Sequence, residues 1–245
     1  TPAQSKGFSM TLKSISKTNK QDARMFCLYG KKMQPAASLL PHEQLNQKRQ
    51  KYKHLSVLKA EKQAFVNRLN ALNYHPNADA MVKDSLAQTI TFFEAQIQLL
   101  TDDVFTLDDD EFERIFKQMT QVVGIGKTTA HALIIATNGL KNFQTAKQVA
   151  KFIGVAPSDK QSGSSLRAKG HITKSSCAQL RTSLYMAAQN AARFNKACKD
   201  LFTRLRAKGK PYKVAIIAVI HKLIKQVFAV VSKNIIFDNE YLLSK

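Results

Sequence analysis

The sequence predicts a mainly α-helical protein that binds nucleic acid. No glycine lies between Lys31 and Val123, and apolar side chains in that stretch recur at helical spacing. The second observation is the charge of the chain. It contains 38 Lys and Arg against 17 Asp and Glu, which gives a formal net charge of +21. A chain this basic selects polyanionic partners, namely nucleic acids or anionic membranes.

Composition excludes several other classes of protein. An apolar content of 44% excludes wholesale disorder. Three widely spaced cysteines form neither a disulfide framework nor a zinc-binding pair, which favours a reducing compartment. The most apolar stretch, residues 214–231, is interrupted by His221, Lys222 and Lys225, so we expect no membrane span.

Residues 35–104 are expected to form a coiled-coil helical hairpin. An apolar row with one lysine steps by three and four along the first half: Leu55, Leu58, Lys62, Phe65, Leu69 and Leu72. After a polar break at 73–77, the row resumes at Leu86, Ile90, Phe93, Ile97, Leu100 and Val104. Periodicity alone leaves open an antiparallel hairpin, a dimerising coiled coil, or two amphipathic helices packed on their own domain.

An acidic cluster follows the second row. Its members are Asp102, Asp103, Asp108, Asp109, Asp110, Glu111 and Glu113. A calcium loop would need a glycine in mid-loop, and none is present. We therefore expect a solvated linker over residues 105–114, with aspartates that cap the next helix.

Residues 115–245 are expected to form the domain that faces the polyanion. Seven of the nine glycines lie from Gly124 onward, and residues 151–213 contain fourteen Lys and Arg against two acids. Alanine-, leucine- and methionine-rich periodicity predicts helices over 177–194 and 213–232.

A Gly-Ile-Gly turn opens this domain. A Walker A loop is excluded, because Gln121 stands where its first glycine belongs. The turn instead indicates a helix-hairpin-helix in which Gly124 and Gly126 let the backbone approach a DNA phosphate. A helix beginning at Lys127 adds charge and a positive dipole. A plain interhelical turn is the alternative.

A serine cluster at residues 161–170 lies among small residues and cations. A serine beside a glycine can approach a scissile phosphate, and nearby cations can stabilise the developing charge. The candidate DNA-binding cations are Arg167, Lys169, Lys174 and Arg181. A flexible loop is the alternative, and spacing alone does not identify a nucleophile.

Asn19 and Asp22 are three residues apart, so both would lie on one face of a helix. Their oxygens could help to hold a divalent cation. An ordinary surface face is the alternative.

These signals occur in a fixed order along the chain. The motifs are KTNKQDAR at 17–24, VVGIGKTTA at 122–130, FIGVAP at 152–157, QSGSSLR at 161–167, GHITK at 170–174 and LRTSLYMAA at 180–188. In these motifs the chain closely resembles the IS110/IS1111 family of insertion-sequence transposases, to which the pilin-inversion recombinases are related.

The resemblance implies an RuvC-like α/β domain with a DEDD carboxylate tetrad, a coiled-coil insertion and a helical transposase domain with a catalytic serine. Residues 1–34 would be the C-terminal end of the RuvC-like domain. Asn19 and Asp22 match the last two tetrad positions, where Mg²⁺ would bind. Ser162 and Gly163 match the family's catalytic Ser-Gly pair. DNA and a guide (bridge) RNA are the implied partners.

We therefore expect a DNA recombinase that forms a phosphoserine–DNA intermediate and self-associates through residues 45–104. The first two tetrad carboxylates would precede Thr1, and Asn19 is neutral. The alternative is a truncated, inactive remnant that only binds nucleic acid and self-associates. A basic RNA-associated protein would explain the charge but not the Ser-Gly segment. Family adjacency favours Ser162 over Ser164 and Ser165 as nucleophile.

Overall fold

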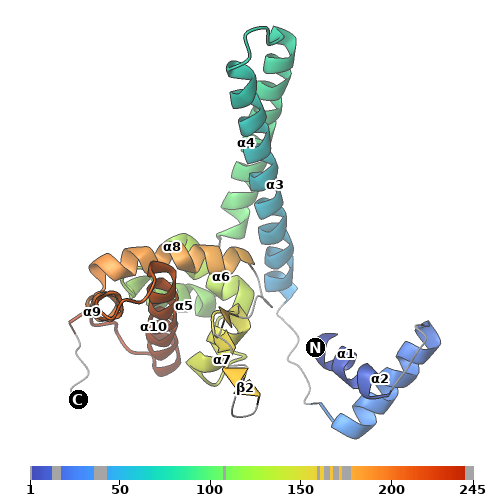
Figure 1. Cartoon of the computed structure of the whole chain (residues 1–245), viewed down its shortest axis with the longest axis vertical. Helices are drawn as coiled ribbons and strands as arrows, with labels where there is room; N and C mark the ends of the chain where they lie inside the picture. Colours follow the sequence, from blue (N-terminus) through green and yellow to red (C-terminus); the bar gives the residue numbers. More distant parts are fainter. Residues whose placement is uncertain are drawn as a thin grey trace. The chain divides into compact units, whose positions relative to one another are not determined.

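The computed structural model describes residues 2–12, 18–35, 43–106, 109–158, 161–162, 166–167, 171–172 and 178–240. The strand residues 157–158, 161–162, 166–167 and 171–172 are described by their backbone alone. The chain divides into two compact units, Thr1–Leu40 and Pro41–Lys245 (Figure 1).

The first unit contains two helices, α1 (Pro2–Thr11) and α2 (Asn19–Met33). The Phe8 and Tyr29 rings pack edge to face with their centroids 5.3 Å apart. Thr18 caps α2 by accepting a hydrogen bond from the Gln21 amide. Residues 2–12 and 18–35 contain no strand, so an RuvC-like end here stays a prediction.

The second unit begins with a helical hairpin formed by α3 (Glu43–Asn73) and α4 (Ala80–Val104), which lie side by side in Figure 1. The two apolar rows face each other, with the Phe65 and Phe93 ring centroids 5.5 Å apart. Lys62, the lysine within the row, pairs with Glu94 at 2.8 Å. Of the three arrangements left open by periodicity, the structure has the antiparallel hairpin.

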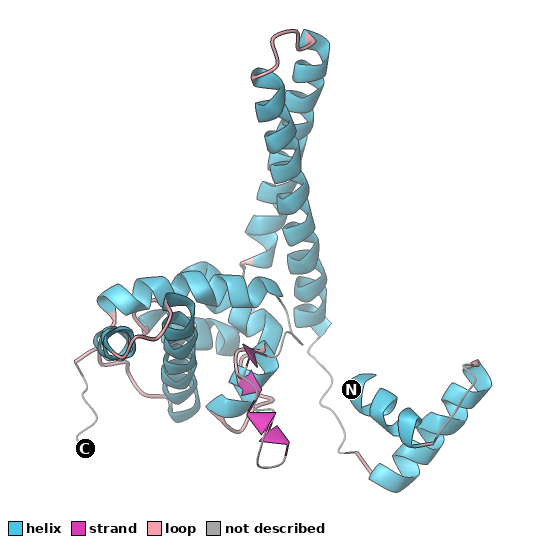
Figure 2. Ribbon diagram, in the orientation of Figure 1, coloured by secondary structure: helices cyan, strands magenta, loops and turns pink. Residues whose placement is uncertain are grey.

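Six further helices follow in the described part of this unit, and most of the ribbon in Figure 2 is helical. They are α5 (Asp110–Gln121), α6 (Lys127–Thr137), α7 (Ala146–Ile153), α8 (Ala178–Phe194), α9 (Lys196–Ala207) and α10 (Tyr212–Lys233). The mainly α fold class is confirmed, as are the helices expected near 177–194 and 213–232.

The acidic segment caps a helix as expected. The Asp109 carboxylate accepts hydrogen bonds from the amides of Glu111 at 2.8 Å and Phe112 at 3.3 Å. These bonds satisfy two amides that have no partner within α5. Because α5 begins at Asp110, the helix begins inside the segment expected to be a linker.

The core lies around α10, which packs against α5, α7, α8 and α9. Eight of its side chains are buried, namely Ala215, Ile216, Val219, Ile220, Leu223, Ile224, Val227 and Val230. Among the described helices α10 alone is long and apolar enough to cross a bilayer. Its apolar side chains fill the core of this unit, which accounts for its composition.

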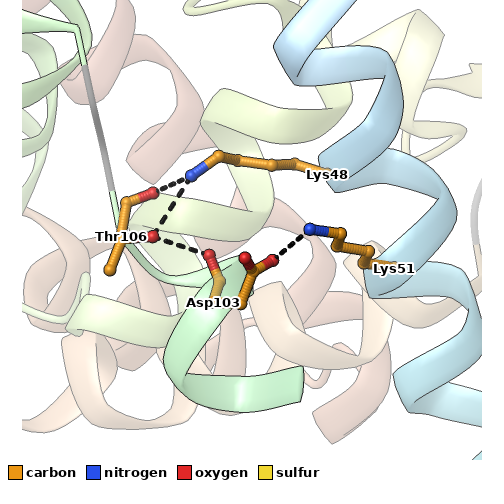
Figure 3. A network of polar contacts seen from close by, with 4 residues as sticks. All are labelled: Lys48, Lys51, Asp103 and Thr106. Atoms are coloured by element: carbon orange, nitrogen blue, oxygen red, sulfur yellow. Dashed lines mark hydrogen bonds and ion pairs between the residues drawn. The ribbon is translucent and has the colours of Figure 1, made fainter. Parts of the chain in front are cut away.

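Polar contacts tie α3 to the end of α4 at the base of the hairpin (Figure 3), and an arginine joins α3 to α6. The buried Lys48 ammonium donates to the Thr106 carbonyl, and Lys51 pairs with Asp103 at 2.6 Å. Arg49 donates from Nε to the Ile135 carbonyl at 2.6 Å, near the C-terminal end of α6. A cation is favourable there because unpaired carbonyls gather at a helix C-terminus.

Two short antiparallel ladders lie between α7 and α8. β1 (Pro157–Ser158) pairs with β4 (His171–Ile172), and β2 (Gln161–Ser162) pairs with β3 (Leu166–Arg167). In chain order β2 and β3 lie between β1 and β4, so the second ladder is nested inside the first.

Candidate nucleic-acid interface

The turn between α5 and α6 is held against α8. Gly124 has φ 106°, a conformation that favours glycine. A Cβ at Gly124 would lie 2.6 Å from the Ala191 Cβ and 3.1 Å from the Ala187 carbonyl oxygen. Gly124 therefore allows a close approach between the turn and α8. Its expected role in DNA binding stays a prediction.

Gly126 differs from Gly124 because it faces open space. It occupies the N-cap of α6 without a side-chain hydrogen bond, and a Cβ there would have no atom within 4 Å. Lys127 and Thr128 follow in the first turn and are exposed. The helix begins at Lys127 as expected, and its first amides face a region that an anion can enter. The helix-hairpin-helix identity of the turn stays a prediction.

An open groove of about 500 Å³ lies between this turn and α8. The α6 side is formed by Gly124, Gly126, Lys127, Thr128 and Thr129, and the α8 side by Met186, Ala187, Gln189, Asn190 and Arg193. Lys127 and Arg193 give the groove a cation on each wall. No acidic side chain lines it, so its charge suits a phosphate backbone.

Sequence reasoning missed Arg193, Asn190 and Gln189. The available signal was the run of alanines at 187, 188, 191 and 192, which is typical of a helix face that packs closely on a neighbour. That signal does not say which neighbour, and only the contact between Gly124 and Ala191 places Arg193 beside Lys127.

A hydrogen bond links the groove to the beginning of α10. Gln189 donates from its amide to the Tyr212 hydroxyl at 3.2 Å, and the Tyr212 ring packs on Phe202 at 5.5 Å. Exposed cations lie near this point of the chain: Arg204 and Arg206 on α9, Lys208 and Lys210 in the turn after it, and Lys213 in the first turn of α10. We call the groove and these cations together the basic surface.

Arg181 lies away from the groove. It is half-buried near the beginning of α8, and its guanidinium donates to the Ile153 carbonyl at the end of α7, at 3.4 Å. Arg193 lies twelve residues further along the same helix, about 18 Å at the usual helical rise. The structure therefore does not bring Arg181 and Lys127 together.

The serine segment is described only in part. Ser162 lies opposite Leu166, and Arg167 lies opposite Gln161, so the backbone places Ser162 and Arg167 in one two-stranded ladder. The other candidates of this region are outside the described residues: Gly163, Ser164, Ser165, Lys169 and Lys174.

Asn19 and Asp22 lie in the first turn of α2, with Asn19 exposed and Asp22 half-buried. The Asp22 amide donates to the Thr18 carbonyl at 2.9 Å, and its carboxylate is favourable beside the helix N-terminus. Asp22 is the one acidic residue of α2, and no group of three potential metal ligands occurs in the described part of the chain. Asn19 and Asp22 supply one amide oxygen and one carboxylate, so an octahedral magnesium ion would need further ligands.

His131 is buried behind the groove on α6. Its Nδ1 lies 2.8 Å from the Lys127 carbonyl oxygen. Burial lowers the pKa of His131 below its ordinary 6.5, opposed in part by the Lys127 and Phe105 backbone carbonyls and assisted by the charges of Lys48 and Lys127. His221 contacts the Val155 carbonyl through Nε2 at 3.0 Å. Both histidines are satisfied at the core boundary, as expected.

Comparison with known proteins finds a family match inside this basic helical domain. Residues 117–203 match the family described as "Transposase IS116/IS110/IS902 family". The match runs from α5 into α9 and includes the Gly124 turn, both walls of the groove and the two β ladders.

Similar proteins extend the comparison along most of the chain. The pilin gene-inverting protein of Moraxella bovis is 28% identical over 241 residues, 94% of this chain and 71% of that protein. Its counterpart in Moraxella lacunata is 27% identical over the same shares. An uncharacterized 43.6 kDa protein of insertion element IS110 in Streptomyces coelicolor is 25% identical over 159 residues, 65% of this chain and 38% of that protein. Together, the family match and these relatives support a transposase of the IS110 family.

Proposed function

We propose that this chain acts in DNA strand exchange, holding DNA on the basic surface and using Ser162 as the nucleophile. One observation carries the proposal. The cation-walled groove and the ladder that contains Ser162 and Arg167 both fall within the segment that matches the transposase family.

The proposed step is a transesterification. The Ser162 oxygen forms a bond to the scissile phosphorus while the bond from phosphorus to one sugar oxygen breaks, and that sugar oxygen leaves with a proton. The hydroxyl of a different strand then displaces Ser162 in the reverse sense and restores a phosphodiester. No oxidant or external energy source is required. Arg167 would stabilise the negative charge on the phosphoryl oxygens.

Magnesium and a guide RNA belong to the proposal as well. Mg²⁺ would supply charge neutralisation at the phosphate, and Asp22 with Asn19 would contribute to its site only alongside further carboxylates. The basic surface accepts RNA by the same electrostatics as DNA. A protein that acts on DNA with a guide RNA would work in the bacterial cytoplasm or nucleoid.

The interface is tested by removing its cations one at a time. Lys127→Ala and Arg193→Ala should each weaken duplex DNA binding and reduce the slope of log Kd against log salt by about 0.9, the value for one phosphate contact. Lys59→Ala removes the same charge from an exposed position on α3 and is the matched control. Equal salt slopes for Lys127→Ala and Lys59→Ala would contradict the interface.

The nucleophile is tested by covalent capture. With Mg²⁺ and target DNA, Ser162→Ala should abolish protein–DNA adducts that survive denaturing electrophoresis, while the Kd for DNA stays within about twofold because Lys and Arg dominate binding. Arg167→Ala should weaken both binding and capture. Ser164→Ala and Ser165→Ala are the controls. If one of them lost covalent capture while Ser162→Ala retained it, the serine replaced in that control would be the nucleophile instead of Ser162.

A binding-only protein is the second candidate. It is favoured by the isolation of Asp22, which has no carboxylate companion within α2. In that case salt-dependent binding through Lys127 and Arg193 would be present, and no covalent adduct would form in the unmodified chain with Mg²⁺.

A further inference from the structure

A second cavity, of about 470 Å³, lies beside the groove and shares Lys127 and Thr128 with it. Its other lining residues are Phe105, Glu113, Phe116, Lys117 and His131. We call this cavity the aromatic pocket. Its volume is within the range of pockets that hold small organic ligands.

Aromatic rings are packed in sequence along this pocket. The Phe116 and His131 ring centroids are 4.3 Å apart, and those of Phe105 and His131 are 5.0 Å apart. Phe105 and Phe116 are only half-buried, so part of each ring is accessible from the cavity. His131 is held by the Lys127 carbonyl, which fixes its ring between the two phenylalanines.

The pocket opens beside positive charge. Lys127 and Lys117 are exposed. Glu113 is the acidic residue among those that line the pocket, and it pairs with Lys117 at 3.0 Å. These two charges offset each other, so the net charge of the lining is the positive charge of Lys127. The residue that separates the aromatic pocket from the phosphate-suited groove is therefore itself a cation.

We propose that the aromatic pocket receives one unpaired base of a nucleic-acid strand, with the adjoining phosphate in the groove next to Lys127. This inference rests on the proposed function, because it takes the groove as the path of the sugar–phosphate backbone. Every base has an apolar face that stacks on aromatic side chains, whatever its sequence. A base inside an intact duplex cannot enter, since both of its faces are already stacked and its edge is paired.

The chemistry of the pocket favours a base over an apolar peptide side chain. The pocket offers the rings of Phe105 and Phe116 as a stacking surface. Lys127 and Thr128 line both the pocket and the groove, so a cation lies where the two meet. A nucleotide presents this combination in one unit, a flat ring joined to an anion, and single-stranded nucleic acids are bound by such combinations.

The test compares single strands with duplexes on the full chain. Phe116→Leu keeps an apolar side chain and removes the ring, whereas Phe26→Leu makes the same change at an exposed position on α2. Phe116→Leu should weaken binding of single-stranded DNA or RNA about 5- to 150-fold, the range for losing one stacked base. Duplex affinity should change by less than about twofold.

A second readout uses a strand that contains one 2-aminopurine, whose fluorescence is quenched by stacking. Quenching should occur with the unmodified chain and with Phe26→Leu, and should be lost with Phe116→Leu. Phe105→Leu gives the same comparison if Phe116→Leu does not fold. Separate DNA and RNA strands show which one supplies the base.

Unchanged single-strand affinity and unchanged quenching in both pocket variants would overturn the aromatic pocket as a base site. If Lys127→Ala still reduced the salt slope for duplex DNA, the proposed function would stand without it. If Lys127→Ala had no effect on either strand form, the groove itself would fail.

Discussion

Gly124 and Ala191 touch across 67 residues of sequence, and a Cβ placed on Gly124 would lie 2.6 Å from the Ala191 Cβ. The two glycines of the Gly-Ile-Gly turn are thus unequal. Gly124 is fixed by packing on α8, whereas Gly126, two residues later, adjoins open space.

This inequality predicts different costs for the same substitution. Gly124→Ala should lower the free energy of unfolding by about 2–4 kcal/mol, because the new methyl overlaps α8 and the residue keeps a positive φ. Gly126→Ala should cost less than about 1 kcal/mol, the usual effect of an unfavourable N-cap residue. Urea denaturation of both variants measures the difference, and equal midpoints would contradict the packing role.

His131 should make stability depend on pH. Its pKa is lowered by burial, so the unfolded chain binds a proton more readily than the folded one. The free energy of unfolding should therefore be constant above about pH 7 and should fall as the pH drops below the ordinary His value of about 6.5. Thermal unfolding at pH 5.5 and 7.5 measures the change.

The control for this prediction is an exposed histidine. His54→Gln, on α3, should keep the pH dependence of the parent, whereas His131→Gln should reduce it. The same slope in both variants would assign the effect to other groups.

Cys198 should resist alkylation in the native state. It is fully buried, and burial raises the pKa of its thiol to about 12, so almost no thiolate is present at neutral pH. Cys27 is exposed and should be modified first. Mass spectrometry after iodoacetamide treatment at pH 7.5 would locate the label, and rapid native modification of Cys198 would show that its environment opens.

Self-association through the hairpin should use a face other than the apolar seam. Phe65 and Phe93 pair within one chain, so the seam is already occupied. Phe92 and Leu99 are 60% and 67% exposed, and at seven residues apart they lie on one face of α4. Introducing Phe92→Glu with Leu99→Glu should convert oligomers to monomers in sedimentation velocity.

Thr91→Glu adds a charge at a neighbouring exposed position of α4 and serves as the control. A monomeric parent, or an unchanged oligomer in the double variant, would exclude this face.

Local features of the fold could be predicted from the sequence. The spacing of Leu55 and Phe65 indicated the hairpin seam, Asp109 was recognisable as a cap, and the Gly126–Lys127 step marked the beginning of α6. Each depends on residues within a few positions of one another, where helical geometry and capping chemistry decide the outcome.

Contacts between distant segments could not be predicted in this way. The hydrogen bond from Arg49 to the Ile135 carbonyl joins residues 86 positions apart, and nothing near either residue encodes it. Arg193 became a candidate only through the packing of Gly124 on α8. Arg181 shows the converse. It was a candidate for DNA binding because its neighbours in sequence are basic, and its guanidinium contacts the Ile153 carbonyl at the end of α7, so its role in DNA binding stays a prediction.

The central position of α10 has a consequence during translation. This helix supplies eight buried side chains, yet it comes after every other described helix in chain order. At about 5–20 residues per second, α5 waits roughly 5 to 20 seconds for Val230 to emerge. Once Arg193 has emerged, the nascent chain carries both cations of the groove but still lacks the helix against which α8 packs.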